Sequence, residues 1–243
     1  MTMLKIEKTV LPSPEQWEII IEGMRNPMNS WDRMDSQTCL EMDGFEDRHI
    51  NPVGVCPRPV GECPRYDGFS HDVFCIGSND HELMTKLAKG GAVHAKYRRM
   101  IPVYVTINAP LYFYKEMDTY KIGTVCNSCS TMHKIHSKEL TLDDFSTDHL
   151  TTVSLDVLDT TIGYLNFCRK WFLANEDKEG WWQMIQLLPT SYNQKRTYMF
   201  NYEVLANIYK WRRNHKLDEW HTFCDWIEEL PYAELITGGA DNG

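Results

Sequence analysis

The sequence lacks any run of apolar residues long enough to cross a membrane, and residues 1–12 lack the basic-then-apolar pattern of a secretion signal. These two absences predict a cytoplasmic protein. It also lacks an excess of basic residues, because 25 Lys and Arg stand against 34 Asp and Glu, a formal charge of −9. This balance gives no general attraction to nucleic-acid phosphates. We therefore expect neither a membrane nor a nucleic-acid partner.

Glycine-rich phosphate signatures are also absent. The chain has no G-x-G-x-x-G motif after a strand and no P-loop lysine, which argues against a Rossmann-type enzyme or a P-loop kinase. It has no internal repeat. Eight cysteines without an export signal are expected to be reduced thiols rather than a disulfide framework.

The 243 residues suffice for one large domain, and we expect a single domain over 1–243. Residues 42–75 carry many Pro and Gly with little periodicity, which predicts a surface insertion. Ser13, Pro14 and Gln16 form a capping-box pattern at the start of a helix. A second helix is expected to begin at Ser78-Asn79, with Glu82 completing its capping box, and to end at Gly90-Gly91. Further helices are expected over 141–144, 155–173, 178–188, 202–213 and 217–230.

The stretch 101–136 is the most informative part of the chain. Val103, Val105 and Ile107 alternate with more polar residues and predict a strand with one buried face. Asn108 is expected to cap a following helix that reaches about residue 120, with Pro110 in its first turn. Small hydroxyl, amide and thiol side chains then crowd into 124–131. They suit either a cradle for an anionic or heterocyclic ligand or a capped, solvated loop.

Cys126, Cys129, His133 and His136 have the side-chain types that bind zinc. Four ligands within eleven residues would close a cramped loop, however, whereas structural zinc sites draw ligand pairs from separate elements. A thiol nucleophile at Cys126 or Cys129 would need a general base, and none is identifiable. We therefore predict no metal site.

Basic residues gather in the C-terminal half, where they can serve a phosphate-bearing ligand: Lys195, Arg196, Lys210, Arg212, Arg213 and Lys216. In a helix, positions 201, 205, 208 and 212 lie near one face, so Asn201 and Arg212 can both address one ligand. The alternative is that Arg212 belongs to a solvated helix end.

Three separated patterns occur in a particular order. Asn108-Ala-Pro110 follows the strand, Leu187-Leu-Pro189 lies twelve residues before Asn201, and Arg212 lies eleven residues after Asn201, with His215 and Glu219 beyond it. In these patterns and intervals the chain resembles the flavin-dependent thymidylate synthases. The resemblance covers roughly residues 79–136 and 183–231.

The chain departs from the family's signature at several positions. Thr119-Tyr120-Lys121 stands where the family has Arg-His-Arg, and Thr124 replaces the signature serine. An ungapped match places Asn127 against the family's glutamate, whereas a one-residue slip preserves Asn127 and Ser130 as its Asn-x-x-Ser pair. Ile185 stands where an arginine for the nucleotide phosphate is expected. These departures concern the reaction rather than the fold.

The resemblance implies an α+β fold with a central mixed sheet and flanking helices. It implies methylation of dUMP, or a related pyrimidine deoxynucleotide, with reduced FAD and methylenetetrahydrofolate in a homotetramer that shares its sites between subunits. The residues it assigns are Arg212 for activating the pyrimidine, His94, Lys121, Asn201 and His215 for the flavin, and Thr124, Asn127, Ser128 and Ser130 for the nucleotide. The alternative is a catalytically inactive nucleotide-binding or structural homologue of phage origin.

Overall fold

The computed structural model describes residues 4–39, 55–56 and 73–238. The chain divides into two compact units, each assembled from separate segments. Unit 1 comprises Met1–Glu7, Thr106–Tyr120 and Cys126–Thr197, and unit 2 comprises Lys8–Val105, Lys121–Val125 and Tyr198–Gly243. Because the strands of the main sheet run through both sets of segments, neither unit corresponds to one continuous stretch of sequence.

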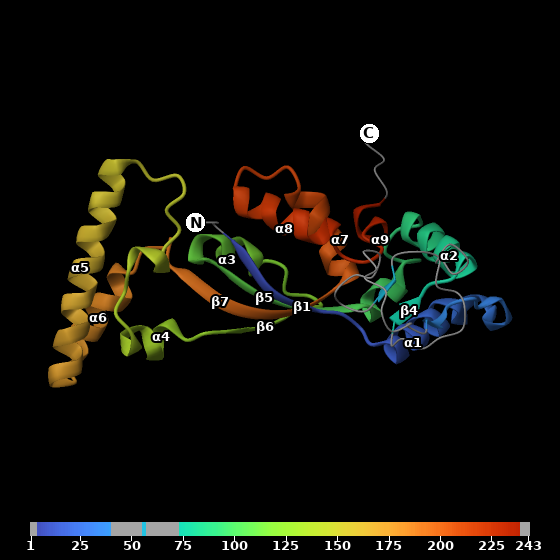
Figure 1. The fold of residues 1–243 in the computed structure, drawn as a ribbon, viewed down its shortest axis with the longest axis horizontal. Coiled ribbons are helices and arrows are strands. Elements are labelled where there is room, and N and C mark those ends of the chain that lie inside the picture. Colours follow the sequence, from blue (N-terminus) through green and yellow to red (C-terminus); the bar gives the residue numbers. More distant parts are fainter. Residues whose placement is uncertain (1–3, 40–54, 57–72, 239–243) are drawn as a thin grey trace, which may run out of the picture. The chain divides into compact units, whose positions relative to one another are not determined.

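The main sheet has four strands in the order β1 (Lys5–Val10), β5 (Pro102–Pro110), β7 (Asn193–Asn201) and β6 (Val125–Ser128) (Figure 1). Val103, Val105 and Ile107 are buried in β5, as their alternation predicts. The strand continues through Asn108 to Pro110, so Asn108 does not cap the next helix. That helix, α3 (Leu111–Met117), follows Pro110 without a side-chain cap and ends three residues before the predicted limit.

In unit 2, α1 (Pro14–Arg25) has the predicted capping box of Ser13 and Gln16. The next long helix, α2 (Ser78–Lys89), is capped from a distance rather than by Asn79. The carboxylate of Asp35 accepts hydrogen bonds from the backbone N–H groups of Asn79 (2.9 Å) and Asp80 (3.0 Å). Short 3-10 helices occupy Asn26–Met28, Trp31–Arg33 and Lys96–Met100.

A second sheet has three strands in the order β2 (Gln37–Cys39), β4 (Val73–Cys75) and β3 (Val55–Cys56). Most of the insertion predicted over 42–75 lies outside the described residues. Phe74 and Cys75, near its end, are buried, and Cys75 is disulfide-bonded. The expectation of reduced thiols is therefore wrong for Cys75, because two cysteines that the fold brings together can pair whatever their spacing in the sequence. Among the described residues, Cys126, Cys129, Cys168 and Cys224 are free.

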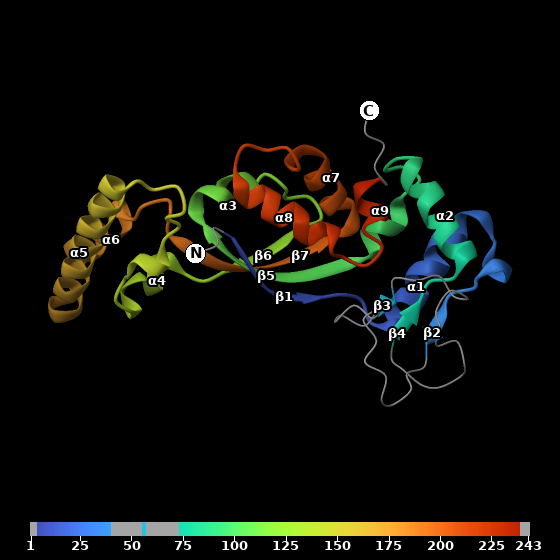
Figure 2. The same cartoon turned by 45° about the horizontal axis from the view of Figure 1, so that its top comes forward.

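Unit 1 carries a helical hairpin of α5 (Thr152–Asn175) and α6 (Lys178–Leu187), which lie side by side in both ribbon views (Figures 1 and 2). Between this hairpin and the sheet strands the chain forms α4 (Thr131–Lys134) and 3-10 helices at Ile135–Ser137 and Leu142–Asp144. The core of this region comprises Ile135, Leu140, Phe145, Leu158, Ile162, Leu165, Cys168 and Met184. No described helix is both long enough and apolar enough to span a bilayer.

Three helices complete unit 2: α7 (Tyr202–Arg212), α8 (Asp218–Glu228) and α9 (Glu234–Thr237). Leu205 and Ile208 of α7 are fully buried, and α8 buries Trp220, Phe223 and Ile227. The arrangement confirms the predicted α+β class. Two of the predicted site residues lie at opposite ends of α7: Asn201 is its N-cap and Arg212 is its last residue.

Candidate functional site

The turn at Gly123 lies against the start of α7. Gly123 has a φ of +76°, a conformation that glycine adopts without strain. Asn201 is the N-cap of α7, because its side-chain oxygen accepts the N–H of Val204 at 3.0 Å, and its amide nitrogen donates to the carbonyl of Gly123 at 3.5 Å. Two predicted site residues, Thr124 and Asn201, thus flank one glycine.

Thr124 contributes an unused polar atom to this turn. Its hydroxyl oxygen is shielded from solvent, although the residue as a whole is only half-buried, and it has no hydrogen-bond partner among the described residues. A shielded hydroxyl without a partner costs free energy that a bound polar group can recover. This atom therefore fits the predicted role of Thr124 as a ligand contact.

Arg212 ends α7 and is held by an aromatic ring. Its guanidinium carbon lies 4.8 Å from the ring centroid of Trp220, and the ring of His215 meets the same indole edge-on at 6.3 Å. Trp220 is fully buried, whereas Arg212 is half-buried. Stacking on an indole fixes the plane of the guanidinium. The structure therefore brings Arg212 and His215 together.

The separation of Asn201 from Arg212 limits what they can share. The face that includes Leu205 and Ile208 points into the core, and the two polar residues lie at opposite ends of α7. Eleven residues of helix extend about 16 Å, so a single small ring cannot contact both side chains of one chain. Only a ligand long enough to extend along α7 can contact both.

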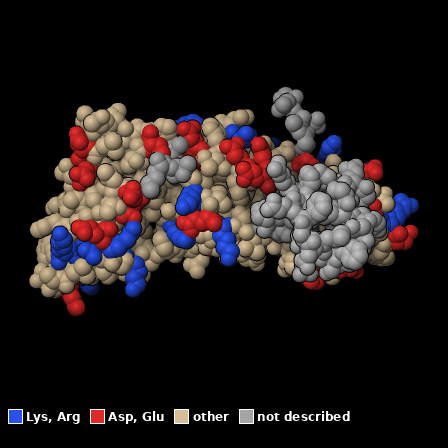
Figure 3. Space-filling view, viewed as in Figure 1, with Lys and Arg blue, Asp and Glu red and all other residues tan. Residues whose placement is uncertain are grey.

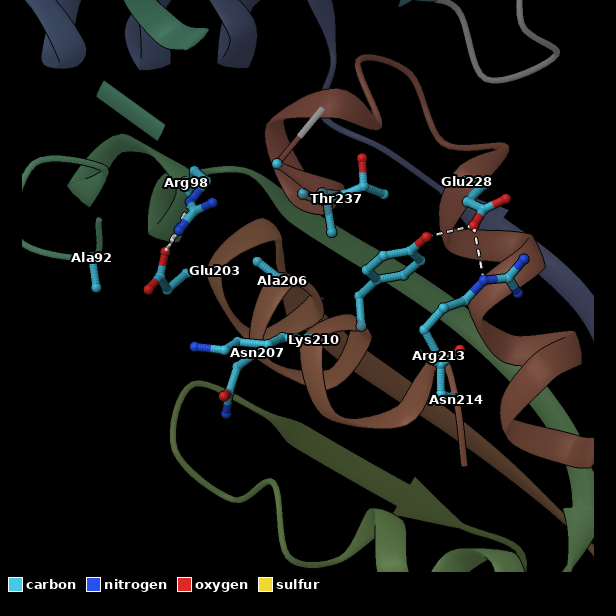
Figure 4. A pocket seen from close by; sticks show the side chains of 13 residues that line it. Ala92, Arg98, Glu203, Ala206, Asn207, Lys210, Arg213, Asn214, Glu228 and Thr237 are labelled. Carbon is cyan, nitrogen blue, oxygen red and sulfur yellow. Dashed lines mark hydrogen bonds and ion pairs between the residues drawn. The ribbon is translucent and has the colours of Figure 1, made fainter. Parts of the chain in front are cut away.

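An open groove of about 910 Å³ runs along the exposed side of α7, within unit 2 (Figure 4). Such a volume accommodates a large organic ligand. The lining residues are Ala92, Arg98, Glu203, Ala206, Asn207, Tyr209, Lys210, Arg213, Asn214, Glu228, Ile236, Thr237 and Gly238. Glu203, Asn207 and Lys210 recur on α7 at helical spacing. The sequence reasoning missed Glu203 and Asn207, although this polar face was visible as a pattern.

Two ion-pair groups stand at opposite ends of the groove (Figure 4). Arg98 pairs with Glu203 at 2.6 Å and donates to the carbonyl of Leu235 at 2.8 Å. At the other end Glu228 accepts the Tyr209 hydroxyl at 2.6 Å and lies 3.2 Å from the guanidinium of Arg213. Burial, and then the bond to Glu228, raise the pKa of Tyr209 to about 12. Tyr209 therefore remains a neutral donor at physiological pH.

Lys210 also lines the groove and makes no ion pair with a described residue. Its ammonium nitrogen is 5.3 Å from the ring centroid of Trp211, and both side chains are exposed. Because Arg98 and Arg213 are already neutralised by carboxylates, Lys210 is the lining cation best able to pair with an anionic ligand.

The remaining predicted residues are exposed or serve as caps. His94 and Lys121 are exposed, and His94 follows Ala92 of the groove lining by two residues. In unit 1, Asn127 and Ser128 are exposed on β6. The Ser130 hydroxyl accepts the N–H of His133 at 3.0 Å and so caps α4. This cap leaves the Ser130 O–H able to donate to a ligand.

The six C-terminal basic residues divide between the two units, with Lys195 and Arg196 in unit 1 and the other four in unit 2. Lys195 pairs with Glu7, and Arg196 pairs with Asp118 at 2.7 Å while stacking on Tyr114 at 4.0 Å, all within unit 1. On the face shown in Figure 3, Lys and Arg are interspersed with Asp and Glu. Three of the six cations, Lys195, Arg196 and Arg213, are thus paired with acidic residues distant in sequence, which reduces the positive charge that they can offer a ligand.

No group of three or more His, Cys, Asp or Glu side chains in the described part of the chain is arranged to hold a metal ion. The zinc alternative based on Cys126, Cys129, His133 and His136 therefore gains no support.

No model of a known protein family matches the sequence, and no curated protein matches it. Solved structures do match it. One is the flavin-dependent thymidylate synthase ThyX from Helicobacter pylori complexed with FAD and dUMP, with 15% sequence identity and a TM-score of 0.58 over 99% of this chain and 100% of that one. A second structure of the same H. pylori enzyme with FAD and dUMP has 15% identity and a TM-score of 0.59 over 100% of both chains. The chain therefore has the fold of the flavin-dependent thymidylate synthases, as its residue intervals predict.

Proposed function

We propose that this chain, having the fold of the flavin-dependent thymidylate synthases, binds FAD and a dUMP-like pyrimidine nucleotide and methylates the nucleotide with methylenetetrahydrofolate. The observation that carries the proposal is that both ends of α7 present side chains suited to binding a ligand. At one end Thr124 and Asn201 flank the Gly123 turn, and at the other Arg212 is stacked on Trp220. Bound flavin would supply hydride transfer.

The residues present suit these ligands chemically. Arg212 donates hydrogen bonds to the edge of the pyrimidine and stabilises negative charge that develops on the ring. Asn201, Lys121, His94 and His215 hold the flavin. Thr124, Asn127, Ser128 and Ser130 donate to the nucleotide and its phosphate, a role suited to hydroxyl and amide groups.

The distance along α7 supports a role for oligomerisation. Because Asn201 and Arg212 of one chain lie about 16 Å apart, a flavin and a pyrimidine in contact with each other would use groups from more than one copy. We therefore include a homotetramer with shared sites in the proposal, acting in the cytoplasm.

The test measures binding and turnover separately. FAD is titrated by absorbance and flavin fluorescence, dUMP by calorimetry, and turnover by tritium release from labelled dUMP with reduced flavin and methylenetetrahydrofolate. Arg212→Gln should weaken dUMP binding about 10- to 100-fold, since it removes a charge-assisted hydrogen bond, and should leave FAD binding within about twofold. Arg33→Gln, which changes an exposed arginine outside the site, is the matched control. Failure of the wild-type protein to bind FAD and dUMP at micromolar concentrations would refute the proposal.

A second candidate function is binding without turnover. It is favoured by Thr119-Tyr120-Lys121 and Ile185, which leave fewer cations for phosphate groups than the family signature supplies. This candidate predicts dUMP binding with no tritium release, whereas the first predicts both.

A further inference from the structure

The outer face of α5 exposes large apolar side chains in a continuous stripe. Val153 is 73% exposed, Val157 63%, Phe167 61% and Tyr164 46%. The opposite face of the same helix is buried in the unit 1 core through Leu158, Ile162, Leu165 and Cys168. A helix that is apolar on both faces ordinarily buries both. A contiguous exposed apolar stripe of this kind marks an interaction surface.

The outer face has a heptad spacing, and we call it the α5 seam. Its positions are Val153, Asp156, Val157, Thr160, Gly163, Tyr164, Phe167, Lys170, Trp171 and Ala174. Each is exposed except Trp171, which is half-buried. Residues at intervals of three and four form the contact line of packed helices, and this line continues for three heptads of α5. The occupant suited to the α5 seam is therefore another helix.

The charges on the α5 seam select the orientation of that helix. Asp156 and Lys170 are its charged members, and each lies seven residues from Gly163. Two copies of α5 packed antiparallel about Gly163 place each Asp156 opposite a Lys170, whereas parallel copies place like charges opposite one another. Opposed like charges in a contact cost free energy, and antiparallel helix dipoles attract.

Neither charge has a strong partner within the chain. Asp156 makes no ion pair with a described residue. The ammonium of Lys170 lies 4.0 Å from Glu139, and both side chains are mostly exposed. A long exposed pair of this kind contributes little free energy. Breaking it so that Lys170 can pair with another copy of the chain therefore costs little.

The centre of the α5 seam permits close approach. A Cβ added to Gly163 would meet no atom within 4 Å, and Thr160, one turn earlier, is also small. We propose that a second copy of this chain packs its α5 antiparallel on this seam, with the two Gly163 residues at a twofold axis and Asp156 paired with Lys170 of the partner subunit. The contact is self-complementary, as a twofold interface requires.

This inference gives a surface to the homotetramer of the proposed function, and its test requires no ligand. Sedimentation velocity over a range of protein concentrations measures the dissociation constant of self-association for the wild type, Asp156→Lys, Lys170→Asp and the double variant. Each single reversal should weaken association about tenfold or more, and the double variant should recover most of the loss. Glu179→Lys, a charge reversal on an exposed residue of α6, should leave association unchanged.

Phe167→Glu provides a second, stronger disruption. It should yield a monomer whose far-ultraviolet circular dichroism and thermal unfolding are close to those of the wild type, because Phe167 does not contribute to the unit 1 core. Failure of FAD binding would refute the proposed function without affecting these association measurements.

Three results would overturn the inference. The first is a wild-type monomer at the highest attainable concentration. The second is an oligomer whose dissociation constant is unchanged by every α5 substitution, which would place the contact on another surface. The third is a wild-type monomer that binds vesicles of anionic phospholipid and loses that binding in Phe167→Glu, which would make a membrane the occupant.

Discussion

Asp80 is a carboxylate that the fold buries completely, together with its partner Arg25. The two side chains meet at 2.5 Å, and the second oxygen of Asp80 accepts from the Ser36 hydroxyl at 2.6 Å and from the backbone N–H groups of Asp35 and Ser36 at 3.0 and 2.9 Å. This single residue therefore joins α1, α2 and the segment before β2. The sequence does not reveal it, because nothing local distinguishes Asp80 from an ordinary acidic residue in the first turn of a helix.

Asp80→Asn should lower the free energy of unfolding by about 3 kcal/mol or more, because it leaves the Arg25 guanidinium buried without a counter-charge. Urea unfolding followed by circular dichroism measures the loss. Asp32→Asn removes a negative charge from an exposed position and should change stability by about 0.5 kcal/mol or less. If both substitutions lowered the free energy of unfolding equally, the buried pair would contribute no more to stability than an exposed carboxylate.

At the scale of elements, most helix positions could be predicted but their termini less well. The predicted 155–173 and 202–213 correspond to α5 at Thr152–Asn175 and α7 at Tyr202–Arg212. Errors arose over the caps. The predicted start of α2 at Ser78 is confirmed, but Asp35 rather than Asn79 caps the helix, and β5 extends through the supposed cap Asn108. Periodicity is local, whereas these terminations depend on neighbours supplied by the fold.

The Gly123 turn yields a prediction at this scale. Gly123→Ala should destabilise the protein by about 2 kcal/mol, because it forces a left-handed φ on alanine and places a Cβ 3.1 Å from Val204 and 3.2 Å from the Asn201 amide. It should also weaken ligand binding, since it displaces Asn201. Gly91→Ala is the matched control.

Gly91 has a φ of +83° with open space around its added Cβ, so its substitution should cost only the strain of about 1 kcal/mol. Urea unfolding and FAD titration of both variants separate strain from crowding. If both alanines proved equivalent in stability and binding, the Gly123–Asn201 contact would have no role in the site.

At the scale of the whole molecule, several tyrosines are kept neutral by burial. Burial is the main cause that raises the pKa of Tyr192 and of Tyr209 to about 12, and it also raises the pKa of Tyr97 and Tyr202. These phenols belong to both units. Because their pKa values are raised in both units, high pH is expected to destabilise the whole fold.

The stability of the protein should therefore fall in alkaline solution. Below the ordinary tyrosine pKa of about 10 the phenols are neutral in both states, and the contribution is constant. Above that pH the unfolded chain releases its phenolic protons first, so the free energy of unfolding falls by about 1.4 kcal/mol per pH unit for each such tyrosine until the folded pKa is reached.

Urea unfolding at about pH 9 and about pH 11 measures this slope, and tyrosinate absorbance reports whether ionisation accompanies unfolding. Tyr209→Phe should reduce the fall in the free energy of unfolding per pH unit by the contribution of one tyrosine. A slope that is unchanged from neutral pH would contradict the burial of these groups.

The sequence by itself determined the elements, because apolar periodicity and turn residues act over a few positions, and it indicated the fold through the intervals that join Pro189, Asn201 and Arg212. The tertiary structure decided the rest. It set Asn201 against Gly123, 78 positions earlier, stacked Arg212 on Trp220 and paired Lys195 and Arg196 with distant carboxylates. It also left the α5 seam uncovered, because which face of an apolar helix is buried depends on the elements that pack against it.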